Sequence, residues 1–206
     1  ISILSKHNAS TDKKLAWGGQ FIVRGISSMT EKDWLMTKQS GAKGLAVGVE
    51  SGSEAVRDHM KKQFSNQALD EFMEQAHKNN VTLTFLMLLG YPTESHEDFL
   101  QTLKMFKRYK KYQSVIESVV LGTTLGILPG TPLAEEMAED IEMNDGENFW
   151  TYKGNPDLDF RERIKRRIIT GEECVRMGYN VPGNHDNYKL LHYLWNVYKR
   201  DRITLP

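Results

Sequence analysis

Short apolar runs alternate with longer amphipathic segments over most of the chain. The strongest run, Val81 to Leu89, consists almost entirely of apolar residues and Thr. A continuous run of this length predicts a strand that is buried on both faces, as in a parallel sheet. The preceding segment has an apolar stripe at helical spacing, formed by Leu69, Phe72, Met73 and Ala76. The pattern therefore predicts a helix followed by a buried strand.

The same reasoning extends along the sequence. Strands are predicted at residues 15–24, 44–49, 81–89 and 115–121. Helices are predicted at residues 30–40, 53–60, 65–80, 133–140, 161–177 and 187–200, and from residue 95 onward. Thr30 and Ser95 each precede an acidic first turn, which is typical of a helix start. Residues 141–159 are polar and contain Gly, Pro and Asn, which favours a loop or linker.

Alternating strands and helices predict an α/β fold with parallel strands and right-handed crossovers. Four strands are too few for the usual eight-stranded barrel, so the sheet is either small and open or lacks strands on its N-terminal side. The predicted domains are residues 1–140, which form the sheet, and residues 141–206, which form a linker and a helical C-terminal tail.

Composition narrows the class of protein. The 206 residues include 27 Lys or Arg and 27 Asp or Glu, so net charge favours neither nucleic acid nor a membrane as partner. No apolar run approaches the roughly 18 residues that span a bilayer. The single cysteine, Cys174, fits a reducing, cytoplasmic setting and excludes an all-cysteine metal site within this chain. The six histidines lack metal-binding spacing, and the basic cluster at residues 161–167 matches no RNA-binding motif.

Three glycine-containing loops follow successive predicted strands. They are Glu50-Ser51-Gly52-Ser53, Gly90-Tyr91-Pro92-Thr93-Glu94 and Pro129-Gly130-Thr131-Pro132. Each loop alone could be an ordinary turn that caps a helix. Together they would meet at one rim of a parallel sheet, where such folds bind ligands. Glu50 could then accept hydrogen bonds from ribose hydroxyls or an ammonium group, and Ser53 would present free N–H groups.

At these residues the chain resembles the C-terminal half of a radical S-adenosylmethionine (SAM) enzyme core. Within that superfamily, the chain most resembles a branch whose members often carry an N-terminal cobalamin-binding domain. The resemblance covers roughly residues 15–137, and the order and spacing of several segments carry it. These segments are Trp17-Gly18-Gly19-Gln20 with Arg24, Gly48-Val49-Glu50-Ser51-Gly52-Ser53, Met60-Lys61-Lys62, Leu86 to Ser95, and Pro129 to Leu133.

The resemblance implies a partial, TIM-like barrel of parallel β/α units whose N-terminal strands are missing here. Glu50 and Ser51 would lie by the SAM ribose or methionine, and Leu88 to Glu94 would line the adenine side. The SAM carboxylate would meet Arg24 or Arg57. The remaining predicted binding residues are Gly52, Ser53, Gly90, Pro92, Gly130 and Thr131.

Radical SAM enzymes also hold a 4Fe–4S cluster on three cysteines, and one cysteine cannot supply them. The resemblance therefore implies a fragment whose partner is the missing N-terminal half of the barrel. SAM and the cluster would be cofactors of the complete enzyme, with cobalamin in addition if this chain follows that branch. The substrate is a small molecule or unknown.

Two other hypotheses stay open. The chain could be a non-catalytic α/β module that retains the SAM-side loops, which SAM affinity without iron and the search for a cysteine-rich partner would test. It could instead be an ordinary phosphate-binding barrel enzyme, which would bind anions at Gly52-Ser53 or Gly130-Thr131.

Overall fold

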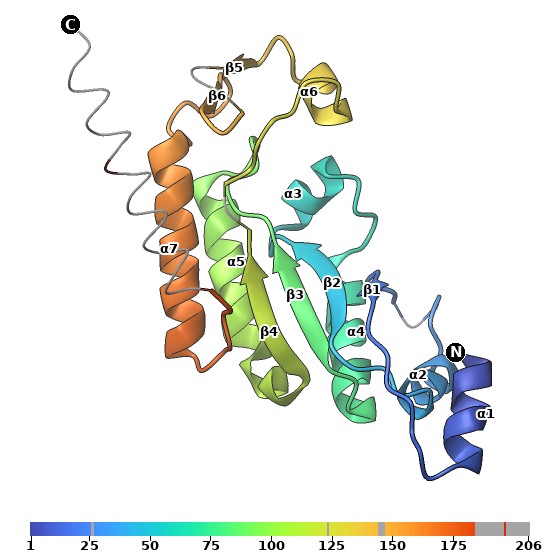
Figure 1. Ribbon diagram of the computed structural model, residues 1–206. Coiled ribbons are helices and arrows are strands. Elements are labelled where there is room, and N and C mark those ends of the chain that lie inside the picture. The colour runs from blue at the N-terminus through green and yellow to red at the C-terminus, as the bar shows by residue number, and fades with distance from the viewer. Residues whose placement is uncertain (26, 123, 144–146, 184–195, 197–206) are drawn as a thin grey trace, which may run out of the picture.

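A four-stranded parallel sheet forms the centre of the molecule in the computed structural model (Figure 1). The structure describes residues 1–25, 27–122, 124–143, 147–183 and 196. Strands follow one another across the sheet in sequence order, β1-β2-β3-β4, and every neighbouring pair is parallel. Their bounds are β1 Gln20–Phe21, β2 Leu45–Glu50, β3 Leu83–Met87 and β4 Ile116–Leu121. The predicted α/β class with a parallel sheet is confirmed, and closure toward a partial barrel stays a prediction.

Helices connect these strands and extend the chain at both ends. They are α1 Ser2–Ser10, α2 Glu31–Gln39, α3 Glu54–His59, α4 Asn66–Asn79, α5 His96–Tyr109, the 3₁₀ helix η1 Lys110–Val115, α6 Pro132–Glu136 and α7 Phe160–Arg176. Thr30 and Ser95 cap α2 and α5 in reciprocal capping boxes with Asp33 and Asp98. Each box satisfies two backbone N–H groups at the helix start, and its residue pattern lets both helix starts be predicted.

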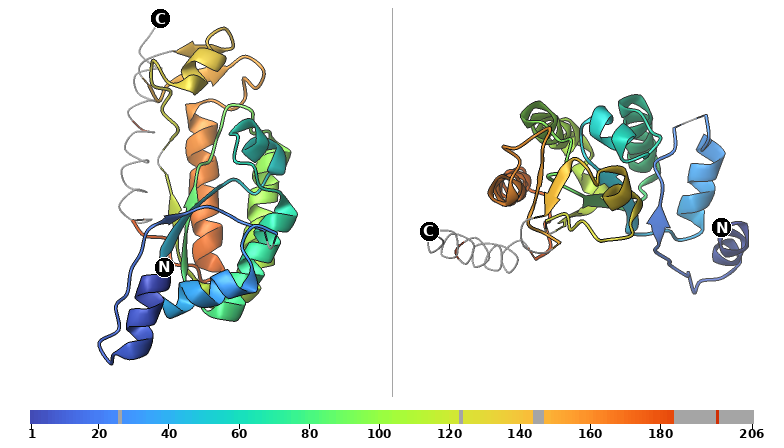
Figure 2. Two further views of the ribbon diagram at one scale, coloured as in Figure 1. Left: turned by 90° about the vertical axis from the view of Figure 1, so that its right-hand side faces the viewer. Right: turned by 90° about the horizontal axis from the view of Figure 1, so that it is seen from above.

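Helices α2, α4 and α5 lie on one face of the sheet (Figure 2). Alternate residues of β2, namely Leu45, Val47 and Val49, point to that face and are fully buried. The intervening residues of β2 are only half-buried, as are their counterparts on β3. One face of the sheet is therefore packed against helices, while the other stays partly accessible.

The chain between β4 and α7 contains a small antiparallel sheet of β5 Ile141–Met143 and β6 Trp150–Tyr152. The prediction of a loop at residues 141–159 was therefore wrong at these two strands. Each strand has three residues, too few for an alternating pattern to appear in the sequence. Trp150 holds this region in place, because its ring is buried and its Nε1 donates a hydrogen bond to the Leu125 carbonyl.

Helix α7 packs beside α5 and β4, close to its predicted position (Figure 1). Its buried Cys174 joins the same hydrophobic core as the strands. The predicted boundary at residue 140 stays a prediction. Apart from residue 196, the helix predicted at residues 187–200 lies outside the described residues.

The N-terminal part differs most from expectation. Helix α1 was not predicted, because its sequence is polar and lacks an apolar stripe. The strand predicted at residues 15–24 shortens to β1, with an isolated bridge between Trp17 and Ala42. Within the described part of the chain, no helix has the length and hydrophobicity that crossing a bilayer requires.

Candidate functional site

Unusual backbone conformations gather at the carboxyl end of β2. Glu50, the last residue of this strand, has φ 64°, and Lys61 and Gln63 in the turn after α3 have φ 60° and 51°. The β2–β3 ladder shifts register between Gly48 and Glu50. Left-handed backbone costs a non-glycine residue about 1–2 kcal/mol. Such strain persists where the surrounding structure enforces it, and it clusters at ligand sites.

The Glu50 carboxylate meets the Lys62 ammonium at 2.7 Å in a partly buried ion pair. Gly48 makes room for this pair. A Cβ at Gly48 would lie 2.6 Å from Glu50 Oε1 and 3.2 Å from Lys62 Nζ. A partly exposed ion pair adds little to the stability of the fold. The pair matters here because of its position at the carboxyl end of β2.

A pocket of about 650 Å³ lies on the accessible face of the sheet beside this pair. Its polar lining includes Gln20, Arg24, Glu50, Lys62 and Gln63, and its apolar lining includes Phe21, Ile22, Phe64 and Leu86. Arg24 is exposed and makes no hydrogen bond or ion pair with other described residues. The pocket thus combines a carboxylate, three cations (Arg24, Lys61 and Lys62) and apolar walls, in a volume typical of small-molecule sites.

A second pocket, of about 310 Å³, shares Glu50, Lys61 and Lys62 with the first. It also contains Tyr91, whose phenol oxygen lies 2.9 Å from His59 Nδ1. Burial raises the pKa of the Tyr91 phenol above its ordinary value. At the edge, Lys61 pairs with Glu136 at 2.9 Å, and that bond lowers the pKa of the Glu136 carboxyl. The Glu50–Lys62 pair therefore belongs to the boundary between two neighbouring pockets.

Ser51, Gly52 and Ser53 are buried and bonded to helix α5 rather than lining either pocket. The Gly52 N–H donates to Thr102 Oγ1 at 2.9 Å, and the Ser53 N–H donates to Ser51 Oγ at 3.1 Å. A Cβ at Gly52 would lie 2.5 Å from the Thr102 backbone. These amide groups already have partners, so they are not free to bind a phosphate.

Arg57 is fully buried as well. Its guanidinium donates to the Ser51 carbonyl and to Asn66 Oδ1, each at 2.7 Å, and lies over the Phe64 ring. This arrangement connects the β2–α3 loop to the start of α4. Arg57 is therefore placed to stabilise the loop, whereas Arg24 faces the larger pocket.

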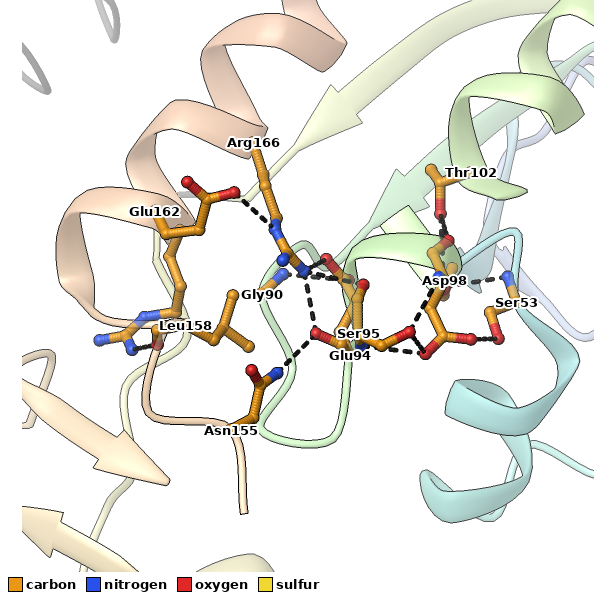
Figure 3. Close-up of polar contacts among 12 residues, drawn as sticks. Ser53, Gly90, Glu94, Ser95, Asp98, Thr102, Asn155, Leu158, Glu162 and Arg166 are labelled. Atoms are coloured by element: carbon orange, nitrogen blue, oxygen red, sulfur yellow. Dashed lines mark hydrogen bonds and ion pairs between the residues drawn. The ribbon is translucent and has the colours of Figure 1, made fainter. Parts of the chain in front are cut away.

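The loop after β3 is fixed by a buried ion pair (Figure 3). The Glu94 carboxylate is completely buried, accepts a hydrogen bond from the Gly90 N–H at 3.1 Å, and meets Arg166 of α7 at 2.9 Å. Burial raises the pKa of Glu94, although Arg166 opposes this shift. Gly90 has φ 72°, and a Cβ there would collide with the side chain of Arg163. Pro92 is buried in the same loop.

In the third loop, Thr131 caps α6 by accepting from the Ala134 N–H at 3.3 Å. Gly130 is exposed, with φ 76°, and a Cβ added there would meet no atom of the described residues within 4 Å. Thus Arg24, Glu50 and Leu88 line these two pockets, while the other predicted residues belong to the surrounding loops or, for Arg57, to helix α3. Ligand contact by any of these residues stays a prediction.

Sequence reasoning assigned no role to Gly48, His59, Lys61 or Lys62. The Met60-Lys61-Lys62 segment was part of the family resemblance, but nothing in it shows that Lys61 adopts a left-handed conformation. Neither the spacing of His59 and Tyr91 nor their residue types predict that they form a pair.

The basic cluster on α7 is largely internal. Arg163, Arg166 and Arg167 are all buried. Arg163 donates to the carbonyls of Trp150 and Leu158, and Arg167 Nε donates to the Gly122 carbonyl at 2.7 Å. These two guanidinium groups donate to backbone oxygens inside the protein, so they do not form a basic surface.

Metal ligands do not converge in the described residues, where no group of three or more His, Cys, Asp or Glu side chains could hold a metal ion. Cys174 is fully buried in the core, and burial raises the pKa of its thiol to about 12. The residues present therefore do not fit a 4Fe–4S cluster, which needs several thiolate ligands.

Taken together, the parallel sheet and its strand-end pockets define an α/β protein whose ligand site would lie at the carboxyl ends of the strands. No family model matches the chain. It is 27% identical over 133 residues to the tRNA-2-methylthio-N(6)-dimethylallyladenosine synthase of Buchnera aphidicola, covering 64% of this chain and 25% of that protein. It is 31% identical over 68 residues to the threonylcarbamoyladenosine tRNA methylthiotransferase of Caenorhabditis elegans, covering 32% of this chain and 16% of that protein.

A solved structure shares the fold. It is the radical SAM methyltransferase TsrM of Kitasatospora setae with tryptophan substrate and a SAM analogue bound, at a TM-score of 0.56 and 11% identity, covering 93% of this chain and 49% of that one. TsrM with cobalamin and a 4Fe–4S cluster bound gives a TM-score of 0.52 at 14% identity, covering 70% and 29%. The predicted resemblance is confirmed to this extent: the sequence matches are to tRNA methylthiotransferases, and the solved structures, at 14% identity or less, share the fold. The chain spans about a quarter or less of the length of the first curated relatives it matches.

Proposed function

We propose that this chain forms the SAM-binding side of a radical SAM enzyme, with the larger pocket as the SAM site. The observation that carries the proposal is the position of Glu50. Its left-handed backbone and the absence of a side chain at Gly48 place a carboxylate on the pocket wall. A glycine would relieve the strain at Glu50, so the presence of a glutamate in this strained conformation favours a function for its side chain.

The chemistry of the pocket fits SAM. The Glu50 carboxylate can accept hydrogen bonds from both ribose hydroxyls, and bonds of this charged kind contribute about 1.5–3 kcal/mol. Arg24, which has no polar partner among the described residues, can pair with the carboxylate of the methionine part. Lys62 holds Glu50 in place before the ligand arrives.

The cluster would have to come from elsewhere, because the one cysteine of this chain is buried in the core. The missing N-terminal half of the barrel is the partner that we propose for this role. The cluster would supply the electron that cleaves SAM, and this chain would bind and orient SAM and exclude water. Cobalamin, which is present in the TsrM structure, stays an expectation for the complete enzyme.

Isothermal titration calorimetry with S-adenosylhomocysteine, without iron, tests the SAM site. We expect Glu50→Gln to weaken binding about tenfold or more, because a neutral amide replaces a charged acceptor. Glu74→Gln is the matched control, since Glu74 is exposed on α4 and lies outside both pockets. Equal affinity in wild type and Glu50→Gln would contradict the proposal.

The second candidate is a non-catalytic module that retains the SAM-side loops, and the buried state of the single cysteine favours it. Both candidates predict binding of S-adenosylhomocysteine. They differ in the effect of a partner chain that carries three clustered cysteines. Such a partner would restore reductive SAM cleavage only if this chain is half of an enzyme.

A further inference from the structure

The smaller pocket has a lining distinct from that of the proposed SAM site. Its walls are mostly apolar and come from several separate segments of the chain, with Met60, Leu88, Leu125, Pro132 and Leu133 as members. Tyr91 adds an aromatic ring, which lies edge-on to His59 with 5.4 Å between ring centroids. At about 310 Å³, the pocket has room for a group of one or two rings.

Charged groups lie at the border of this apolar space. Lys61 pairs with Glu136, and Lys62 pairs with Glu50, so two ammonium groups border the pocket beside the His59 ring. Ammonium groups are attracted to the face of an aromatic ring, and aromatic rings pack edge-to-face with each other. An aliphatic group would gain only the burial of apolar surface.

His59 also supplies a directional contact. Its Nδ1 is engaged with the Tyr91 hydroxyl, and its Nε2 forms no hydrogen bond within the described part of the chain. Because His59 lines the pocket, this second nitrogen can exchange a hydrogen bond with a polar atom on the ligand.

We propose that the smaller pocket binds the aromatic ring of a substrate, next to a SAM molecule in the larger pocket. This inference rests on the proposed function for the identity of the neighbouring ligand. The two pockets share Glu50, Lys61 and Lys62, so ligands bound in both would approach each other at the Glu50–Lys62 pair. His59 and Tyr91 select the aromatic group.

The test uses the full chain labelled with ¹³C at the methionine methyl groups, with benzimidazole as the probe. Benzimidazole is planar and carries both a hydrogen-bond donor and an acceptor, so it can pair with either tautomer of His59. We expect saturable shifts of the Met60 methyl signal, assigned with Met60→Leu. The signal of Met29, which lies in neither pocket, should stay unchanged.

Two controls test whether the probe binds in the smaller pocket and whether that pocket prefers an aromatic ligand. Leu133→Trp places a large ring in the smaller pocket only, so it should weaken benzimidazole binding about tenfold or more. Its affinity for S-adenosylhomocysteine should stay within about twofold, which also shows that the variant folds. Cyclohexanecarboxamide, a non-planar probe with a donor and an acceptor, should bind about tenfold more weakly than benzimidazole.

Competition between S-adenosylhomocysteine and benzimidazole shows whether the two ligands share one site or occupy two. Saturating S-adenosylhomocysteine should leave benzimidazole affinity unchanged or raise it, and displacement of the probe would overturn the proposal. An unshifted Met60 signal, or equal binding of the non-planar probe, would overturn it as well. If benzimidazole binds at Met60 while S-adenosylhomocysteine does not bind at all, the proposed SAM site fails and the aromatic pocket stands.

Discussion

Replacing Arg166 with methionine should cost the protein much of its stability. The side chains of Arg166 and Glu94 are 5% and 0% exposed. Arg166 Nη1 donates to Glu94 Oε1 at 2.9 Å, and also to the carbonyls of Glu94 and Ser95. Methionine preserves much of the apolar stem but leaves the Glu94 carboxylate buried without its counter-ion. Loss of one partner of a buried ion pair costs about 3–5 kcal/mol.

The pH dependence of this loss has a definite sign. Burial raises the pKa of Glu94, and the hydrogen bond and charge of Arg166 act against that increase. Without Arg166 the pKa of folded Glu94 rises further, while the unfolded carboxyl still ionises near its usual pKa of about 4.3. A raised pKa in the folded state means that stability falls as pH rises above the unfolded value. Arg166→Met should therefore lose less stability at pH 5 than at pH 8.

Urea unfolding at both pH values measures these effects. The matched variants are Glu94→Gln and the double variant Glu94→Gln with Arg166→Met. The double variant no longer buries a charge, so it should be more stable than Arg166→Met at pH 8. A loss in Arg166→Met below about 1 kcal/mol, or one equal at both pH values, would refute the reasoning.

Three further predictions concern individual residues. Gly52→Ala should destabilise the fold by about 1–3 kcal/mol in urea unfolding, because its Cβ meets the Thr102 backbone, whereas Gly130→Ala in open space should cost only about 1 kcal/mol. Gly48→Ala should weaken binding of S-adenosylhomocysteine in calorimetry, since its Cβ displaces Glu50; unchanged affinity would contradict this. Cys174 should react with Ellman's reagent only on unfolding, because its thiol is buried and its pKa is about 12; prompt reaction in native buffer would contradict this.

Local chemistry accounts for the parts of the fold that the sequence could predict. Thr30 and Ser95 start helices because their capping boxes lie within four residues of sequence. Strand β3 lies inside the predicted 81–89 run, because burial of a central parallel strand leaves a continuous apolar signal. The small antiparallel sheet of β5 and β6 has neither a capping box nor a continuous apolar run. Its stability depends on the buried Trp150 and on contacts with α7.

Site residues were harder to predict, because the same residue types can either bind a ligand or hold a loop together by internal hydrogen bonds. Ser51 and Ser53 follow a strand, as ligand-binding residues do, but here their hydroxyl groups bond the backbone and side chains of the loop and of α5. Lys62 pairs with Glu50 after a turn in which Lys61 has a left-handed backbone, a conformation that the sequence pattern does not predict. Arg166 belongs to a basic cluster in the sequence, and its burial is explained by its ion pair with the buried Glu94 carboxylate.

The most direct test of the SAM site is a crystal structure of this chain with S-adenosylhomocysteine. We predict that the ribose hydroxyls lie within hydrogen-bond distance of the Glu50 carboxylate, about 2.5–3.0 Å, and that the carboxylate of the ligand points toward Arg24. A ligand bound away from the larger pocket, or one whose ribose makes no contact with Glu50, would contradict the account.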